Sequence, residues 1–258
     1  MSMPFFAPGD DPGSSFPALL RRLGSDPFPP GSAEMSVPHA TTCVALRFAD
    51  GVIMAGDRRA TSGNLISHRT MEKVCEADRH SGVAIAGAAG PAMEMVKLFQ
   101  LQLEHYEKVE GLPLSLEGKA NQLSMMLRGN LPAAMQGLVV VPIFAGWDLR
   151  RRVGRLFAYD VTGGRYEEAD QVATGSGSLH AGTVIKVGYR EAMGRDEAIE
   201  LCVRALWEAA DADSATGGPD PLRGIFPVVA TITEAGFERV ADDELRQRFQ
   251  AVADRSRS

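Results

Sequence analysis

Thr41 and Thr42 are the residues with the clearest chemical potential, and they stand where the sequence changes character. A proline- and glycine-rich segment ends in Pro38-His39-Ala40, and a run of apolar and β-branched residues begins directly after Thr41. If the chain is cut between Ala40 and Thr41, Thr41 gains a free α-amine. A threonine hydroxyl is a weak nucleophile, and an amine on the same residue, with an ordinary pKa of about 8, supplies the base it needs. The pattern alone also fits a structural Thr-Thr pair at the start of a strand.

Residues 1–40 differ from the rest of the chain in composition. Eight of the 15 prolines lie in this segment, with glycines between them. Proline removes a backbone donor and glycine loses much entropy on ordering, so we do not expect this segment to form a packed core. Two interpretations stay open: a disordered tail, or a prosegment that is removed when the protein matures.

From Thr41 onward, strand patterns and helix patterns follow one another. The run 42–48 (TCVALRF) predicts a strand, Asp50-Gly51 predicts a tight turn, and 52–56 (VIMAG) predicts the returning strand. Apolar residues at intervals of three and four predict a helix from about Pro91 to Gly111. By the same criteria we expect a strand pair at 73–76 and 82–87, a helix at 116–131, strands at 138–147 and 153–159, helices at 177–193 and 195–211, and a strand at 225–233.

The order of these elements indicates the fold class. Strands are followed by two helices, more strands, two helices and a last strand, which does not suit the alternating units of a parallel sheet. The order suits two antiparallel sheets packed face to face with helix pairs on their outer surfaces, an α+β fold. We expect one domain over 41–240 and a polar C-terminal tail at 241–258 that is helical or loose.

Composition and motifs exclude several classes of protein. With 45% hydrophobic and 23% charged residues, the chain is typical of a soluble globular protein, and no apolar stretch approaches the roughly 20 residues of a membrane-spanning helix. A net charge of −6 without a basic run argues against nucleic acid as a main partner. Three widely spaced cysteines predict neither disulfides nor a zinc site, and with no secretory signal they indicate the cytoplasm. The motifs G-x-S-x-G, Walker A and H-E-x-x-H are absent from the sequence.

Several short motifs, each weak alone, form a specific combination. They are T-T at 41–42, G-D-R-R-A-T at 56–61, E-K-V at 72–74, G-A-A-G at 87–90, R-G-N at 128–130, A-M-Q-G at 134–137, D-V-T-G-G-R-Y at 160–166, G-S-G-S at 175–178 and D-S-A-T-G-G at 213–218. The combination resembles the catalytic β subunit of the proteasome core particle, most closely the actinobacterial form, from about Thr41 to Thr233. The resemblance implies the N-terminal-nucleophile (Ntn) hydrolase fold, a four-layer αββα sandwich of two antiparallel sheets flanked by helices. This agrees with the element order above.

The resemblance also implies the central catalytic roles. Thr41 would be the N-terminal nucleophile, Lys73 would lie beside its hydroxyl, and Asp57 would pair with Lys73. The chemistry supports these roles, because a nearby ammonium group lowers the pKa of the Thr41 amine and hydroxyl. A carboxylate partner keeps that ammonium group charged and oriented.

Four further residues match supporting positions of the family. The backbone N–H of Gly87 would stabilise the oxyanion of the tetrahedral intermediate, and a glycine lets substrate approach the backbone closely. Ser176, Asp213 and Thr216 would form a hydrogen-bonding group around the Thr41 amine. The family more often has serine at the position of Thr216, and threonine keeps the hydroxyl. For these last three residues, a structural role in their loops is the alternative.

The resemblance implies a site for an extended peptide. Thr61 and Ala89 match backbone positions that pair with the substrate as an added strand. The pocket for the side chain before the cut bond would be lined by apolar residues: Ala60, Met71, Ile85, Ala89 and Met93. We therefore expect a preference for apolar side chains there. For Ile85 and Met93, packing in the core is the competing interpretation.

One position departs from the family, which usually has glycine immediately before the nucleophile, where this chain has Ala40. Self-cleavage requires the Thr41 hydroxyl to attack the Ala40 carbonyl within a strained backbone, and alanine restricts that backbone more than glycine does. We expect cleavage between Ala40 and Thr41 to occur, but more slowly.

Taken together, these patterns predict a threonine endopeptidase that is made as a precursor, degrades unfolded cytosolic proteins and requires no metal or organic cofactor. The family implies homo-heptameric β rings stacked on rings of α subunits, an ATP-driven unfoldase ring, and tagged protein substrates. Two alternatives stay open: an HslV-like peptidase, and a structural ring subunit that is never processed.

Overall fold

The computed structural model describes residues 41–62 and 65–256, so the interpretations of 1–40 concern residues outside the described ranges. Two antiparallel sheets form the centre of the described part. The first sheet has the order β10-β1-β2-β11-β12, with β1 Thr42–Phe48, β2 Gly51–Gly56, β10 Gln171–Gly175, β11 Val228–Thr233 and β12 Gly236–Arg239. The second has the order β5-β6-β7-β8-β9, with β5 Val74–Asp78, β6 Ser81–Ala84, β7 Ile143–Asp148, β8 Val153–Tyr159 and β9 Arg165–Glu168. A separate hairpin consists of β3 Ala60–Ser62 and β4 Leu65–His68.

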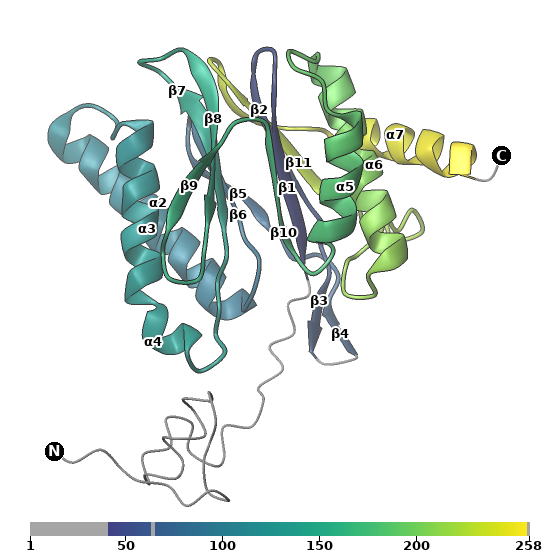
Figure 1. Ribbon diagram of the computed structural model, residues 1–258, viewed down its shortest axis with the longest axis horizontal. Helices are drawn as coiled ribbons and strands as arrows, with labels where there is room; N and C mark the ends of the chain where they lie inside the picture. Colours follow the sequence, from purple (N-terminus) through teal and green to yellow (C-terminus); the bar gives the residue numbers. More distant parts are fainter. Residues whose placement is uncertain (1–40, 63–64, 257–258) are drawn as a thin grey trace, which may run out of the picture. The chain divides into compact units, whose positions relative to one another are not determined.

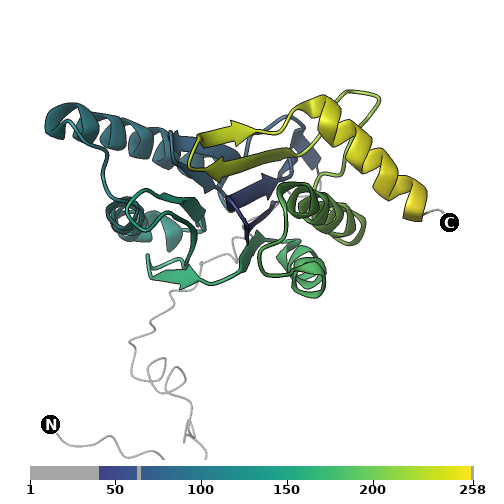
Figure 2. The same ribbon diagram turned by 90° about the horizontal axis from the view of Figure 1, so that it is seen from above.

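Helices cover the outer face of each sheet, and Figure 1 shows the resulting four layers. The second sheet is covered by α2 Ala89–Glu110 and α3 Leu116–Gly129, with the short α4 Leu131–Ala134 after them. The first sheet is covered by α5 Ser178–Gly188, α6 Arg195–Ala212 and α7 Asp242–Ser256. Seen from above in Figure 2, the sheets lie between the two helix groups. This is the expected αββα sandwich. Over 41–62 and 65–256, every helix is too short or too polar to cross a membrane.

The central strand β1 is apolar at successive positions because both of its faces are buried. Val44 and Leu46 belong to the cluster under α5 and α6, whereas Cys43 and Ala45 belong to the cluster between the two sheets. Successive side chains of a strand point to opposite faces, so a shift of one residue would exchange the two sets. The packing therefore fixes the register of β1, and with it the position of Thr41 at the start of the strand.

The segment 241–258, expected to be a polar tail, is helical at α7 and packs with the sandwich. Leu245, Phe249 and Val252 are buried in the same cluster as residues of α6 and β11. These three side chains recur at intervals of four and three, which places them on one face of the helix. The packed unit therefore continues through α7.

Several element boundaries differ from the expected ones. β7 begins at Ile143 rather than at 138, and β11 begins at Val228 rather than at 225. Pro142 and Pro227 directly precede these strands, and proline has no N–H to donate to a ladder. α5 ends at Gly188 rather than at 193, because the next residue, Tyr189, is extended (φ −68°, ψ 137°).

The short strands β3, β4, β9, β10 and β12 are not indicated by the apolar pattern. β9 (RYEE), for example, carries three charged residues out of four and has no buried face. Its hydrogen bonds come from pairing with β8, a contact that a local pattern does not contain.

The sheet register brings distant segments to one end of the sandwich. Thr42 pairs with Gly175 at the end of β10, and Cys43 pairs with Gly56 at the end of β2. The residues that follow those two strands therefore lie on either side of Thr41.

Candidate active site

Thr41 directly precedes β1 and Thr42 is its first residue, and they are 3% and 0% exposed. Gly175, at the end of β10, runs directly alongside them with a φ of 97°. A Cβ at position 175 would lie 2.0 Å from the carbonyl oxygen of Thr41. Glycine is therefore required for β10 to approach the Thr41 peptide this closely.

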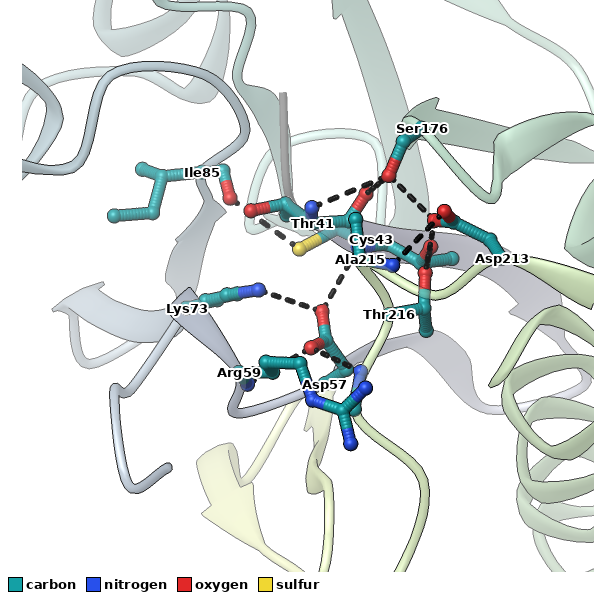
Figure 3. A network of polar contacts seen from close by, with 12 residues as sticks. Thr41, Cys43, Asp57, Arg59, Lys73, Ile85, Ser176, Asp213, Ala215 and Thr216 are labelled. Carbon is teal, nitrogen blue, oxygen red and sulfur yellow. Dashed lines mark hydrogen bonds and ion pairs between the residues drawn. The ribbon is translucent and has the colours of Figure 1, made fainter. Parts of the chain in front are cut away.

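On one side of the threonines, Asp57 and Lys73 form a buried ion pair, drawn in Figure 3. The Lys73 Nζ lies 2.7 Å from Asp57 Oδ1, and the same oxygen accepts the backbone N–H of Thr42 at 2.8 Å. The other oxygen, Oδ2, accepts the N–H groups of Arg59 at 2.9 Å and Gly217 at 2.8 Å. These donors satisfy both carboxylate oxygens, which is the condition for a buried charge pair to be tolerated.

The shared oxygen of Asp57 joins the Lys73 ammonium group to the peptide between Thr41 and Thr42. Lys73 Nζ and Thr42 N both lie within hydrogen-bonding distance of Oδ1, so the Lys73 charge is held next to Thr41-Thr42. A positive charge at this place favours the deprotonated forms of neighbouring groups. The arrangement is suited to activating a hydroxyl or an amine at Thr41.

On the other side, a second polar group approaches Thr41. Ser176 Oγ lies 3.5 Å from the Thr41 nitrogen and 3.4 Å from its carbonyl oxygen. Asp213, which directly follows α6, accepts at Oδ2 the hydroxyls of Ser176 at 2.5 Å and Thr216 at 2.6 Å. Burial acts to raise the pKa of Asp213, but the hydrogen bonds from Ser176, Thr216 and the N–H of Ala215, together with the nearby His180, outweigh it and hold that pKa below its ordinary value. Asp213 is therefore an anion at neutral pH and accepts both hydroxyls.

Gly87 has a φ of 107° and lies in a bridge to Val140. The bridge includes a hydrogen bond from the N–H of Ala88 to the carbonyl of Val139, at 2.7 Å, and the N–H of Gly87 takes no part in it. A Cβ at position 87 would lie 2.1 Å from the Val139 oxygen. Both the backbone angle and the lack of room require glycine at this position.

The residues expected to bind substrate occupy β3, the segments next to Lys73 and Gly87, and the start of α2. Ala60 is buried in β3, Thr61 follows it, and Ala89 is exposed at the first residue of α2. The other three share one apolar cluster between the second sheet and its helices: Met71, Ile85 and Met93. Ile85 is only 2% exposed, so its side chain is a core residue, whereas the two methionines are half-buried.

Three residues make contacts in the candidate site that the sequence did not predict. The Thr42 hydroxyl contacts Thr216, Gly217 donates to Asp57, and the Cys43 thiol donates to the carbonyl of Ile85 at 3.4 Å. Burial raises the pKa of Cys43 well above its usual range, so the thiol stays protonated and serves as a link in the structure. Thr42 and Gly217 both lie within motifs that could have pointed to them, T-T at 41–42 and D-S-A-T-G-G at 213–218.

Comparisons with known proteins identify the family of the chain. The family model described as "Proteasome subunit" matches residues 37–220. The chain is 58% identical over 250 residues to the proteasome subunit beta of Acidimicrobium ferrooxidans, which covers 96% of this chain and 92% of that protein. It is 56% identical to the proteasome subunits beta of Streptomyces griseus (90% of this chain, 83% of that protein) and Jonesia denitrificans (84% and 72%). The chain belongs to the proteasome subunit family.

Proposed function

We propose that this chain is a catalytic β subunit of a proteasome core particle and cuts peptide bonds with Thr41 as an N-terminal nucleophile. The supporting observation is the pair of polar groups around Thr41, Asp57 with Lys73 on one side and Ser176 with Asp213 on the other. The relatives named above, which are β subunits, support the subunit type.

Maturation starts when Thr41 Oγ attacks the carbonyl carbon of Ala40. The C–N bond between Ala40 and Thr41 breaks, the nitrogen takes up the hydroxyl proton, and the Ala40 carbonyl becomes esterified to Oγ. Water then hydrolyses the ester, which leaves a carboxylate on Ala40 and a free hydroxyl and amine on Thr41. Residues 1–40 leave as a prosegment.

The mature site uses the new amine as its base. The neutral Thr41 amine takes the proton of its own hydroxyl, and Oγ attacks the carbonyl carbon of a substrate peptide. The N–H of Gly87 stabilises the oxyanion, the leaving amine takes up the proton, and water releases the acyl group from Oγ. Lys73 keeps the Thr41 amine neutral by its charge, and Asp57 holds Lys73 in place. All groups come from the chain, so these steps need no cofactor.

The substrate is an extended peptide with an apolar side chain before the cut bond. Thr61 and Ala89 supply backbone groups for strand pairing, and the half-buried Met71 and Met93 supply adaptable apolar surface. Fluorogenic peptides test this specificity: hydrolysis after leucine or tyrosine should exceed hydrolysis after arginine or aspartate. Equal rates after apolar and charged residues would contradict it.

The subunit acts within an enclosed assembly in the cytoplasm. A protease for unfolded chains must be confined, and heptameric β rings stacked on α rings would confine it, fed by an ATP-driven unfoldase with tagged proteins. Electron microscopy of the chain co-expressed with its α partner measures the symmetry. Sevenfold particles are expected, whereas a sixfold ring would favour the HslV-like peptidase.

The intact mass of the chain in those particles tests the catalytic claim. A species that begins at Thr41 is expected, and Thr41→Ala should abolish both this species and peptide hydrolysis. Thr41→Ser, which keeps a hydroxyl, should retain part of both. Full-length chain alone in assembled particles would instead indicate a structural subunit that is never processed.

A further inference from the structure

The hydroxyl of Thr42 is a buried group that the mechanism above does not use. Thr42 and Thr216 are both 0% exposed, and their Oγ1 atoms lie 2.5 Å apart. Thr216 Oγ1 in turn lies 2.6 Å from Oδ2 of Asp213. The contact therefore joins the residue after the nucleophile to the carboxylate that holds Ser176.

The direction of these hydrogen bonds follows from the number of protons. A hydroxyl carries one proton, and an ionised carboxylate only accepts. Thr216 therefore donates its proton to Asp213, and the 2.5 Å contact requires Thr42 to donate to Thr216. The result is a directed series in which Thr42 donates to Thr216 and Thr216 donates to Asp213, the acceptor that Ser176 also contacts.

Thr42 also holds the opposite half of the site through its backbone. Its N–H donates at 2.8 Å to the Asp57 oxygen that pairs with Lys73. One residue thus contacts both polar groups that flank Thr41, one through its N–H and the other through its hydroxyl. In Figure 3, Asp57 lies below Thr41 beside Lys73, and Thr216 lies to the right beside Asp213.

The loop at Gly177 packs closely against the hydroxyls of Thr42 and Thr216. A Cβ at Gly177 would lie 2.3 Å from Thr42 Oγ1 and 2.7 Å from Thr216 Oγ1. The backbone of Gly177 (φ −85°, ψ 7°) has the angles of the third residue of a type I turn, which most residues can adopt, so the conformation does not require glycine. Glycine is required at this position because a side chain would displace the two hydroxyls.

We propose that Thr42 is a positioning residue whose hydroxyl, by donating to Thr216, orients the Asp213 and Ser176 pair toward the nitrogen of Thr41. The inference rests on the proposed function of Thr41. Thr42 reaches the reacting atoms only through other residues, so its loss should lower kcat and the rate of self-cleavage and leave KM unchanged.

A double-mutant cycle tests the proposal on the full chain co-expressed with its α partner, with a fluorogenic peptide that ends in an apolar residue. Thr42→Val keeps the shape and removes the hydroxyl, and Thr42→Ser keeps the hydroxyl. We expect Thr42→Val to lower kcat about tenfold, the effect of losing one buried hydrogen bond, and Thr42→Ser to stay within about threefold of wild type. Thr42→Val combined with Thr216→Val should be no slower than Thr216→Val alone, because both changes break the same series.

Gly177→Ala provides a second route, since it inserts a methyl group between the hydroxyls and removes neither of them. Gly177→Ala should lower kcat without changing KM. If Thr42→Val fails to assemble, Gly177→Ala and Thr42→Ser together test the proposal. Wild-type kcat in Thr42→Val, or independent multiplicative losses in the double variant, would overturn the proposal. If the wild-type chain itself is never processed and cuts no peptide, the proposed function fails first, and this inference falls with it.

Discussion

Lys73 and Asp57 form an ion pair that joins the two sheets, with 2.7 Å between Nζ and Oδ1. Lys73 directly precedes β5 of the second sheet, and Asp57 directly follows β2 of the first. Their side chains are 1% and 0% exposed. Two apolar residues would fill the same space without the desolvation penalty of burying charges. The pair is therefore better explained by chemistry at Thr41 than by stability.

The first prediction follows from this pair. Asp57→Asn should lower the free energy of unfolding by about 3–5 kcal/mol, because it removes the carboxylate that pairs with the buried Lys73 ammonium, and it should abolish hydrolysis. Adding Lys73→Met should restore much of the stability and none of the activity. Urea unfolding and peptide hydrolysis measure the two effects.

A matched control for this prediction is Asp243→Asn, since the Asp243 side chain is 83% exposed in its ion pair with Arg246. That change should alter the unfolding free energy by less than about 1 kcal/mol. An Asp57→Asn variant as stable as the control would contradict the proposed dependence of Lys73 on Asp57.

The two glycines of the G-A-A-G motif give the second prediction. At Gly87, alanine would meet the Val139 oxygen at 2.1 Å with a φ of 107°, whereas at Gly90 nothing lies within 4 Å of the added Cβ. Gly87→Ala should therefore reduce hydrolysis strongly and destabilise the fold, and Gly90→Ala, within α2, should leave both unchanged or stabilise the helix by up to about 1 kcal/mol. Thermal unfolding and peptide hydrolysis are measured for both variants. Equal stability and equal hydrolysis rates in the two variants would contradict the proposed requirement for glycine at position 87.

The sequence predicts the sandwich because its central strands are apolar on both faces. β1 and β2 are bounded by a clear turn at Asp50-Gly51, and α2 and α6 carry regular apolar stripes, so these elements could be identified from local pattern. β9 and β10 are partly exposed and mixed in composition, and they are strands because of their partners β8 and β1. Their existence depends on tertiary pairing, which no local window contains.

The residues of the candidate site also divide into those that the local sequence indicates and those that depend on distant contacts. Thr41 could be proposed from sequence because the change in composition and the chemistry of an amine coincide at one position. The contacts of Asp57 with Lys73 and of Ser176 with Asp213 join segments that are far apart in the chain, so only the family resemblance indicated them. The hydroxyl contact of Thr42 depends on a loop that approaches at Gly177, and only the structure reveals it.

Ala40, the residue before the proposed nucleophile, gives the third prediction. Ala40→Gly should speed self-cleavage, because glycine reaches the strained backbone required for attack by the Thr41 hydroxyl more readily. Ala40→Val, with a β-branched side chain, should slow it further than alanine does. The fraction of chain that begins at Thr41, followed by mass spectrometry during assembly, gives the rates. Mature particles of all three chains should hydrolyse peptide at equal rates. A difference between these rates would show that residue 40 affects a step other than maturation.

The last prediction concerns the pH dependence that Asp213 gives to stability. Burial raises the pKa of Asp213, but the hydrogen bonds from Ser176, Thr216 and the N–H of Ala215, together with the nearby His180, overcome this and hold the pKa below the unfolded value of about 3.9. A carboxyl whose pKa is depressed by folding stabilises the protein at pH values above the unfolded pKa, and this contribution is lost as the pH falls through the folded pKa. Asp213→Asn should therefore be less stable than wild type at neutral pH.

The difference between the two proteins should shrink as the solution is acidified below about pH 4 and vanish below the folded pKa of Asp213. Urea midpoints of the unassembled full chain, measured for both proteins across this range, follow the change. Asp211→Asn, at an exposed residue in the last turn of α6, is the control and should track wild type within about 0.5 kcal/mol throughout. Parallel curves for Asp213→Asn and wild type down to the acid limit would show that the contacts of Asp213 do not stabilise its ionised carboxylate.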